Sequence, residues 1–252
     1  MNNALGSLEN EIQFLKTKLL ELTKNYSSKL KGFDLLTIRV KEIIRVFAIY
    51  QKLLEKFDDD TIEISNEDTT SDITEEDIRN IDEEFDSAIK QVEDEIIDHF
   101  LYNSAYSTME ELTMLVYVYF FTRKVLTQKK LRYLTGLSLG KISQIIKFLT
   151  ELQIIEDLDK IELKSIIPTD KMRQKIYSMN SIQRSFFRSS LNSGKKILQS
   201  QNKFEVLKNE LVENKLEFET LNGYRRILGV LDNYLKLFSI FNKVEHLFKD
   251  FI

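Results

Sequence analysis

Helical periodicity dominates the pattern of hydrophobic and polar positions along the chain. Apolar side chains recur every three or four residues over residues 5–31 and again over residues 34–57, with lysine and glutamate between them. Such spacing predicts two long amphipathic helices. We expect residues 1–57 to form a helical hairpin within one chain or a coiled coil with a second subunit.

The next segment changes character. Residues 58–74 are acidic, polar and poor in helix-forming residues, which predicts a flexible linker. Thr74 then precedes three acidic residues, the pattern of a capped helix start. A regular apolar stripe follows as far as residue 100, so residues 75–107 are predicted to contain one connecting helix that leads into the next domain.

Residues 127–155 contain the most informative pattern, two short helices separated by a glycine turn. Thr127 and Ser138 are each predicted to cap a helix, and Gly136 supplies the turn between them. The second helix has one apolar stripe and a polar opposite side, which favours a helix-turn-helix whose second helix enters the DNA major groove. The side chains expected to face DNA are Lys129, Lys130, Arg132, Ser138, Lys141, Ser143, Gln144 and Lys147.

After Leu152 two short runs alternate apolar and polar residues, with Asp157–Lys160 between them as a turn. This alternation predicts a small β-hairpin, the wing of a winged helix. Its tip is mostly acidic, unlike a basic wing that grips the minor groove. The predicted fold class is mainly α, with a winged helix-turn-helix domain over residues 108–170 that carries a short β-hairpin wing and is flanked by long N- and C-terminal helices.

The run from Gly136 to Ser143 resembles the G-x-S-x-G-x-[IV]-S pattern of winged-helix regulators of the MarR superfamily, and is most similar to the GbsR-like branch. The resemblance covers about residues 108–170 and implies a DNA-binding regulator, with Lys141, Ser143 and Gln144 on the recognition helix. Two features depart from the family. The recognition helix ends in Gln-Ile-Ile rather than a Gly-Leu-Val-like exit, and the segment before residue 108 has no counterpart.

Residues 171–252 are predicted to be a helical dimerisation region, with helices over residues 170–200, 203–221 and 224–251 and a break near residues 192–194. The last helix is apolar around much of its circumference. Such a surface must be covered, either by the N-terminal helices or by a second subunit. A homodimer would place two recognition helices on a palindromic site, and a small-molecule effector pocket between the long helices is a further possibility.

Charge is distributed unevenly. The chain has a net charge of −4, but residues 108–200 contain 16 Lys and Arg against 8 Asp and Glu, whereas residues 55–98 contain 3 Lys and Arg against 19 Asp and Glu. The basic excess coincides with the helix-turn-helix, where attraction to phosphate depends on local charge. One hypothesis is that the acidic linker competes with DNA for this basic region.

Composition narrows the function further. The chain has no cysteine and only two histidines, His99 and His246, so we expect no metal site and no cofactor, and an intracellular, cytoplasmic location. A partly buried, satisfied side chain is the expected state of His99. We find no catalytic arrangement and predict that the protein is not an enzyme. The apolar run over residues 112–121 is too short to span a membrane.

The leading hypothesis is therefore a homodimeric transcriptional regulator that binds double-stranded DNA. The alternative is an architectural or scaffold subunit whose winged-helix domain binds other proteins, for example in chromosome organisation. Salt dependence separates the two, since a protein that neutralises about five phosphates should show a log–log slope of about −4 to −5.

Overall fold

The computed structural model describes residues 2–55, 73–103, 109–158, 174–179, 181–221 and 223–248. Nearly all of the predicted acidic linker, and the second run of the predicted wing hairpin, lie outside these residues. The described chain is mainly helical, with a small three-stranded antiparallel sheet. It divides into two compact units, residues 1–186 and residues 187–252, whereas the sequence placed a boundary near residue 170.

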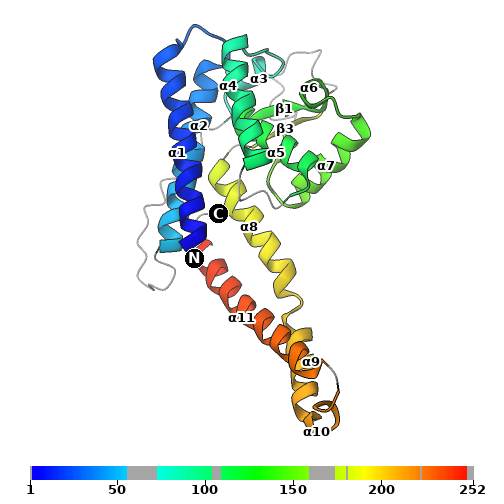
Figure 1. The fold of residues 1–252 in the computed structure, drawn as a ribbon. Coiled ribbons are helices and arrows are strands. Elements are labelled where there is room, and N and C mark those ends of the chain that lie inside the picture. The colour runs from blue at the N-terminus through cyan, green and yellow to red at the C-terminus, as the bar shows by residue number, and fades with distance from the viewer. Residues whose placement is uncertain are drawn as a thin grey trace. The chain divides into compact units, whose positions relative to one another are not determined.

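The first unit begins with two long helices that pair within one chain. Helix α1 (Asn2–Asn25) lies along α2 (Phe33–Glu55), so the structure has the hairpin form of the two predicted alternatives (Figure 1). The predicted heptad positions of α1 supply much of the contact. Fully buried side chains of the pair are Leu8, Leu15, Leu22, Leu36, Val40 and Ile43.

The turn between α1 and α2 holds a distant segment of the chain. Gly32 has a φ of +84°, and a Cβ atom at this position would lie 2.2 Å from the ring of Phe85. The amide of Lys31 donates to the carboxylate of Asp86 at 2.8 Å, and the amide of Asp86 donates back to the carbonyl of Lys31 at 3.1 Å. Glycine is required here because the backbone conformation is left-handed and the aromatic ring fills the space of a side chain.

Residues 75–103 do not form the single predicted helix. They form α3 (Glu75–Arg79), α4 (Ser87–Asp98) and a short π-helix, η1 (His99–Asn103), with an irregular segment between α3 and α4. The predicted cap is confirmed, because Thr74 Oγ1 accepts from the amide of Asp77 at 3.1 Å. The predicted helix breaks because its apolar residues pack into two separate clusters. Ile78 and Ile81 pack against Val125 and Ile176, whereas Ile89, Val92 and Ile96 of α4 pack into the main core.

Two polar contacts connect α1 to the α4–η1 segment. Lys18 forms an ion pair with Glu95 of α4. His99 Nε2 lies 2.6 Å from Glu11 Oε2, and its ring stacks on Phe14 with centroids 3.8 Å apart. The histidine is therefore largely buried and partnered, which confirms the expectation for it.

Helix α5 (Glu111–Arg123) lies at the centre of the first unit. Ten of its thirteen residues are buried, so it has no solvent-facing stripe. This fits its sequence, in which apolar residues occur on every side, and it is possible because α2 and α4 cover part of the helix while α6 and α7 cover the rest.

Arg39 of α2 binds the C-terminal end of α5. Its side chain is 1% exposed. Its Nε donates to the carbonyl of Phe121 at 2.8 Å, and Nη2 donates to the carbonyls of Phe120 at 3.0 Å and Met179 at 3.1 Å. Nη1 lies 2.6 Å from Glu42 Oε2. One guanidinium thus connects α2 to two carbonyls in the last turn of α5 and to the carbonyl of Met179. The carbonyl of Phe120 also accepts from the amide of Lys124 at 3.2 Å.

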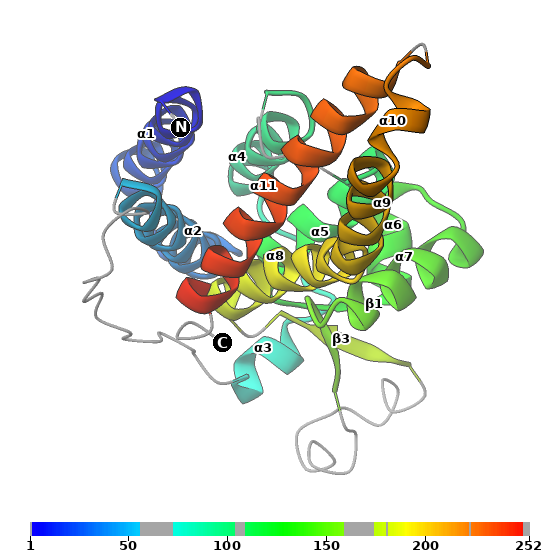
Figure 2. The same ribbon diagram turned by 90° about the horizontal axis from the view of Figure 1, so that it is seen from below.

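The sheet follows α5. Strand β1 (Val125–Thr127) pairs with β3 (Ile176–Ser178), which in turn pairs with β2 (Glu156–Asp157), all antiparallel. Beside β1 and β3 lie α6 (Gln128–Thr135) and α7 (Leu139–Glu151) (Figure 2). Strand β2 pairs with β3, while the second run of the predicted hairpin lies outside the described residues. One prediction was wrong here. Residues 176–178 are strand, not helix, because pairing with β1 buries Ile176 and Tyr177.

The second unit consists of helices. Helix α8 (Ile182–Leu198) enters it without the break predicted at residues 192–194. It is followed by α9 (Gln201–Glu213), α10 (Lys215–Phe218) and α11 (Tyr224–Phe248). Helices α9 and α11 pack together through Phe204, whose ring centroid is 5.0 Å from Tyr234 and 5.6 Å from Phe238. The apolar stripe of α11 is thus partly covered within the chain, and dimerisation through it stays a prediction.

Candidate nucleic-acid interface

The helix-turn-helix predicted from residues 127–155 corresponds to α6 and α7. Thr127 Oγ1 accepts from the amide of Lys130 at 3.0 Å, which caps α6. Gly136 ends that helix with a φ of +70°. Ser138 Oγ accepts from the amide of Lys141 at 3.3 Å and caps α7. All three local predictions are confirmed, and together they set the angle between the two helices.

Helix α7 has one buried and one exposed face. The buried stripe is the predicted one, Ile142, Ile145, Ile146 and Leu149. Opposite it, Gly140, Gln144, Lys147 and Glu151 follow one another at helical spacing and are all exposed. Ser143 lies beside this line and is exposed too. The structure therefore brings Ser143, Gln144 and Lys147 of the predicted site onto one solvent-facing surface, with Lys141 at its edge.

On α6 only part of the prediction holds. Lys129 and Arg132 are exposed, as expected. Lys130 was expected to face outward, but its side chain is 5% exposed. Its Nζ lies 2.5 Å from the carboxylate of Glu84 and 3.1 Å from the carbonyl of Asp82. This lysine is engaged by the segment between α3 and α4, and the outward placement of Lys130 was wrong.

Arg123, the last residue of α5, is also paired within the chain. Its Nη2 and Nε bind the two carboxylate oxygens of Glu93 at 2.7 and 2.8 Å, and its guanidinium lies 3.8 Å from the ring centroid of Phe85. Glu93 is fully buried and also accepts from the hydroxyl of Thr122 at 2.7 Å. A bidentate, stacked arginine of this kind is a structural element of the core rather than a phosphate contact.

Lys124 is the third cation of this region that is paired within the chain. Its Nζ lies 2.9 Å from Asp77 Oδ2, and its side chain is 4% exposed. The cations Arg123, Lys124 and Lys130 are thus neutralised by Glu93, Asp77 and Glu84 of the acidic segment. The local positive charge that this region presents to solvent is therefore smaller than its sequence suggests. The missed partners had one sequence signal, the strongly acidic stretch that directly precedes the basic one.

The remaining cations form weaker contacts. Lys141 Nζ lies 3.2 Å from Glu110, and Lys147 Nζ lies 3.9 Å from Glu151. Both pairs are solvent-accessible, and exposed ion pairs contribute little, so a phosphate group can replace the carboxylate at small cost. With Lys129 and Arg132, they leave four accessible cations on α6 and α7.

Within the first unit, a hydrogen bond connects α5 to the end of α6. The hydroxyl of Tyr119 donates to the carbonyl of Leu134 at 3.2 Å, and burial raises the pKa of this tyrosine. Near the sheet, Lys175 Nζ lies 3.4 Å from the carboxylate of Asp157 in β2. The hydroxyl of Tyr119 thus stays protonated and supports the orientation of α6 against α5.

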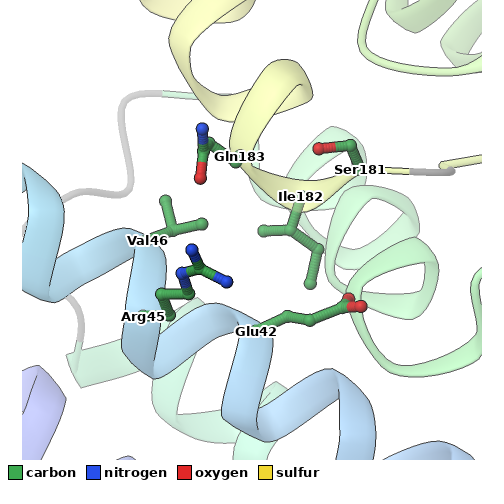
Figure 3. A pocket seen from close by; sticks show the side chains of 6 residues that line it. All are labelled: Glu42, Arg45, Val46, Ser181, Ile182 and Gln183. Carbon is green, nitrogen blue, oxygen red and sulfur yellow. The ribbon is translucent and has the colours of Figure 1, made fainter. Parts of the chain in front are cut away.

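A small hollow lies between α2 and the start of α8 (Figure 3). It has room for about one water molecule. It is therefore too small for an organic effector, and the predicted effector pocket stays a prediction. The lining residues are Glu42, Arg45, Val46, Ser181, Ile182 and Gln183.

Two further features of the described residues concern metal binding and membrane insertion. Within that part of the chain, no group of three or more side chains is placed to hold a metal ion. Among the helices whose residues are described, none has the length and apolar character needed to cross a membrane. Comparison of the chain with models of protein families, with curated proteins and with solved structures found no match.

Proposed function

We propose that the protein is a DNA-binding transcriptional regulator that reads duplex DNA with α7. The observation that carries this proposal is the exposed polar face of α7 above a fully buried apolar stripe. The order α5, β1, α6, α7, β2, β3, with β3 between β1 and β2, supports a winged-helix arrangement. In that arrangement the third helix is the one that enters the major groove.

The chemistry of the exposed face fits base and phosphate contacts. Gln144 carries a donor and an acceptor that match the major-groove edge of adenine, and Ser143 can bond to either kind of edge. Lys147, with Lys129 and Arg132 of α6, supplies charge for phosphates. A homodimer is part of the proposal, because two copies of α7 would then meet two half-sites of a palindrome.

The proposal is tested by mobility shift of the full-length protein with genomic fragments at about 50 mM and about 200 mM salt. Four accessible cations per protomer predict a log–log slope of about −3.5 for each protomer bound. Affinity that falls in this way supports the proposal. The absence of any shift at either salt concentration contradicts it.

A variant pair sharpens the test. Replacing Gln144 and Lys147 by alanine removes one amide and one cation from the exposed face of α7. We expect the preference for the bound site over unrelated DNA to fall by about 1–3 kcal/mol, and the log–log slope of affinity against salt to become shallower by about one for each protomer. The matched control replaces Asn202 and Lys203, an exposed amide and cation on α9, and should leave binding unchanged. Equal affinity of both variants would contradict a reading role for α7.

A second function is favoured by one specific observation. Three large apolar side chains are exposed on the same two helices, Tyr133 at 70%, Leu139 at 47% and Phe148 at 40%. Together with the internal neutralisation of three cations, they fit a scaffold subunit whose winged-helix module binds protein. That function requires no DNA affinity, so the mobility shift separates the two.

A further inference from the structure

Gly140 has no explanation inside the described chain. It lies in the first turn of α7 and has an ordinary helical backbone, unlike Gly32 and Gly136, which have positive φ. A Cβ added at Gly140 would meet nothing within 4 Å. A helical glycine with neither a conformational nor a packing reason costs stability relative to alanine. Gly6 in α1 is equally open, so location distinguishes Gly140: it lies on the line with Gln144 and Lys147.

Leu139 is the neighbour of this glycine and is 47% exposed. It flanks the polar face, one helical turn before Ser143. Nearly half of this apolar side chain is exposed to water rather than covered by the protein. In the major groove the apolar group available to such a side chain is the C5-methyl of thymine, and contact with that methyl distinguishes thymine from the other bases.

We infer that the first turn of α7 is where the helix comes closest to the bases, with Gly140 allowing the approach and Leu139 lying against a thymine methyl. This inference rests on the proposed function and names its target, a half-site with an A·T pair at the position read by the start of α7. Exposed cations on both sides of this turn, Lys129 and Arg132 on α6 and Lys147 on α7, supply the charge complementarity to the flanking phosphates.

The experiment uses duplexes selected by the full-length protein from a random library. Each selected site is synthesised with thymine and again with deoxyuridine, which removes only the C5-methyl. Loss of one buried methyl should weaken binding about fourfold per half-site. The Leu139→Ala variant should bind the thymine duplex more weakly than wild type and should no longer distinguish the two duplexes.

Gly140→Ala provides the second arm. The added methyl should weaken DNA binding about tenfold or more while raising the midpoint of chemical denaturation, since alanine is the better helix former. The matched control is Gly6→Ala, which adds a methyl at another open helical position and should leave DNA binding unchanged. A fold defect cannot account for weaker binding by a more stable protein.

The outcomes separate the inference from the proposed function. If wild type selects and binds DNA but binds the uracil duplex equally well, or if Leu139→Ala keeps the full preference for thymine, the inference is overturned and the proposed function stands. If Gly140→Ala binds as tightly as wild type, the close approach is overturned. If no duplex is selected, the proposed function fails, and the inference fails with it.

Discussion

Arg39 offers the sharpest test of what holds the first unit together. We consider Arg39→Met, which keeps much of the side-chain length and removes every donor. The variant removes the hydrogen bonds that Arg39 donates to the carbonyls of Phe120, Phe121 and Met179, and it removes the ion pair between Arg39 and Glu42. Burial already lowers the pKa of the guanidinium, although an arginine remains charged in proteins. The side chain therefore acts as a fixed positive charge surrounded by oxygen atoms.

The size of the effect follows from these contacts. A hydrogen bond to a charged group contributes about 1.5–3 kcal/mol, and removal of one partner from a buried ion pair costs about 3–5 kcal/mol. The contributions share one guanidinium and do not add, so we expect Arg39→Met to lower the free energy of unfolding by about 3–5 kcal/mol. The measurement is urea-induced unfolding followed by far-ultraviolet circular dichroism.

Two further variants locate the energy. Arg39→Lys keeps the charge beside Glu42 but lacks the planar fork that reaches three carbonyls, so its loss should be intermediate. Changing Glu42 as well, in Arg39→Met with Glu42→Gln, should recover only the part of the loss that comes from the broken Arg39–Glu42 ion pair. The control is Arg226→Met on the exposed surface of α11, which should change stability by less than about 0.5 kcal/mol. If Arg39→Met also changed the free energy of unfolding by less than about 0.5 kcal/mol, the conclusion that Arg39 stabilises the C-terminal end of α5 would be wrong.

Three other predictions concern the same unit and use the same unfolding assay. Gly32→Ala should lose more than about 2 kcal/mol, because the added Cβ is strained and meets the ring of Phe85 at 2.2 Å; a loss near zero would contradict this. Glu93→Gln should lower the free energy of unfolding by about 3 kcal/mol, because Arg123 stays charged and buried without its carboxylate partner. A loss below about 1 kcal/mol, the size typical of an exposed ion pair, would refute this. The hydrogen bond from Lys18 lowers the pKa of Glu95, so the stability that this pair contributes is present above the unfolded pKa of about 4.3 and is lost as pH falls through the folded pKa. Because the pair is partly exposed, Glu95→Gln should lower the free energy of unfolding by less than about 1 kcal/mol at neutral pH, and this difference should vanish in acid.

Local chemistry explains what the sequence could predict. The hydroxyls of Thr127 and Ser138 cap helices through contacts three residues away, and Gly136 ends α6 by its own left-handed conformation. The apolar stripe of α7 is read from spacing alone. Each of these features depends on neighbours within one or two helical turns, so the residues that determine it are adjacent in the printed sequence.

Long-range contacts explain what the sequence could not predict. The residues of β3 become a strand by pairing with β1, about fifty positions earlier, and their apolar spacing fits a helix equally well. Lys130 is buried by Glu84, which reaches it only because the helix over residues 75–100 breaks. The sequence showed an acidic stretch followed by a basic one. It did not show that the two are ionic partners, which is why the expected outward placement failed.

The burial of α5 has a consequence for how this region can be inherited or engineered. A helix covered by α2 and α4 as well as by α6 and α7 has no side left to face water. Excision of the helix-turn-helix from residue 109 onward would expose the apolar flank of α5 and would also remove the arginine that binds its last carbonyls. The segment is therefore not a portable module. Recombination that moves it to another protein would have to carry α2 and α4 with it.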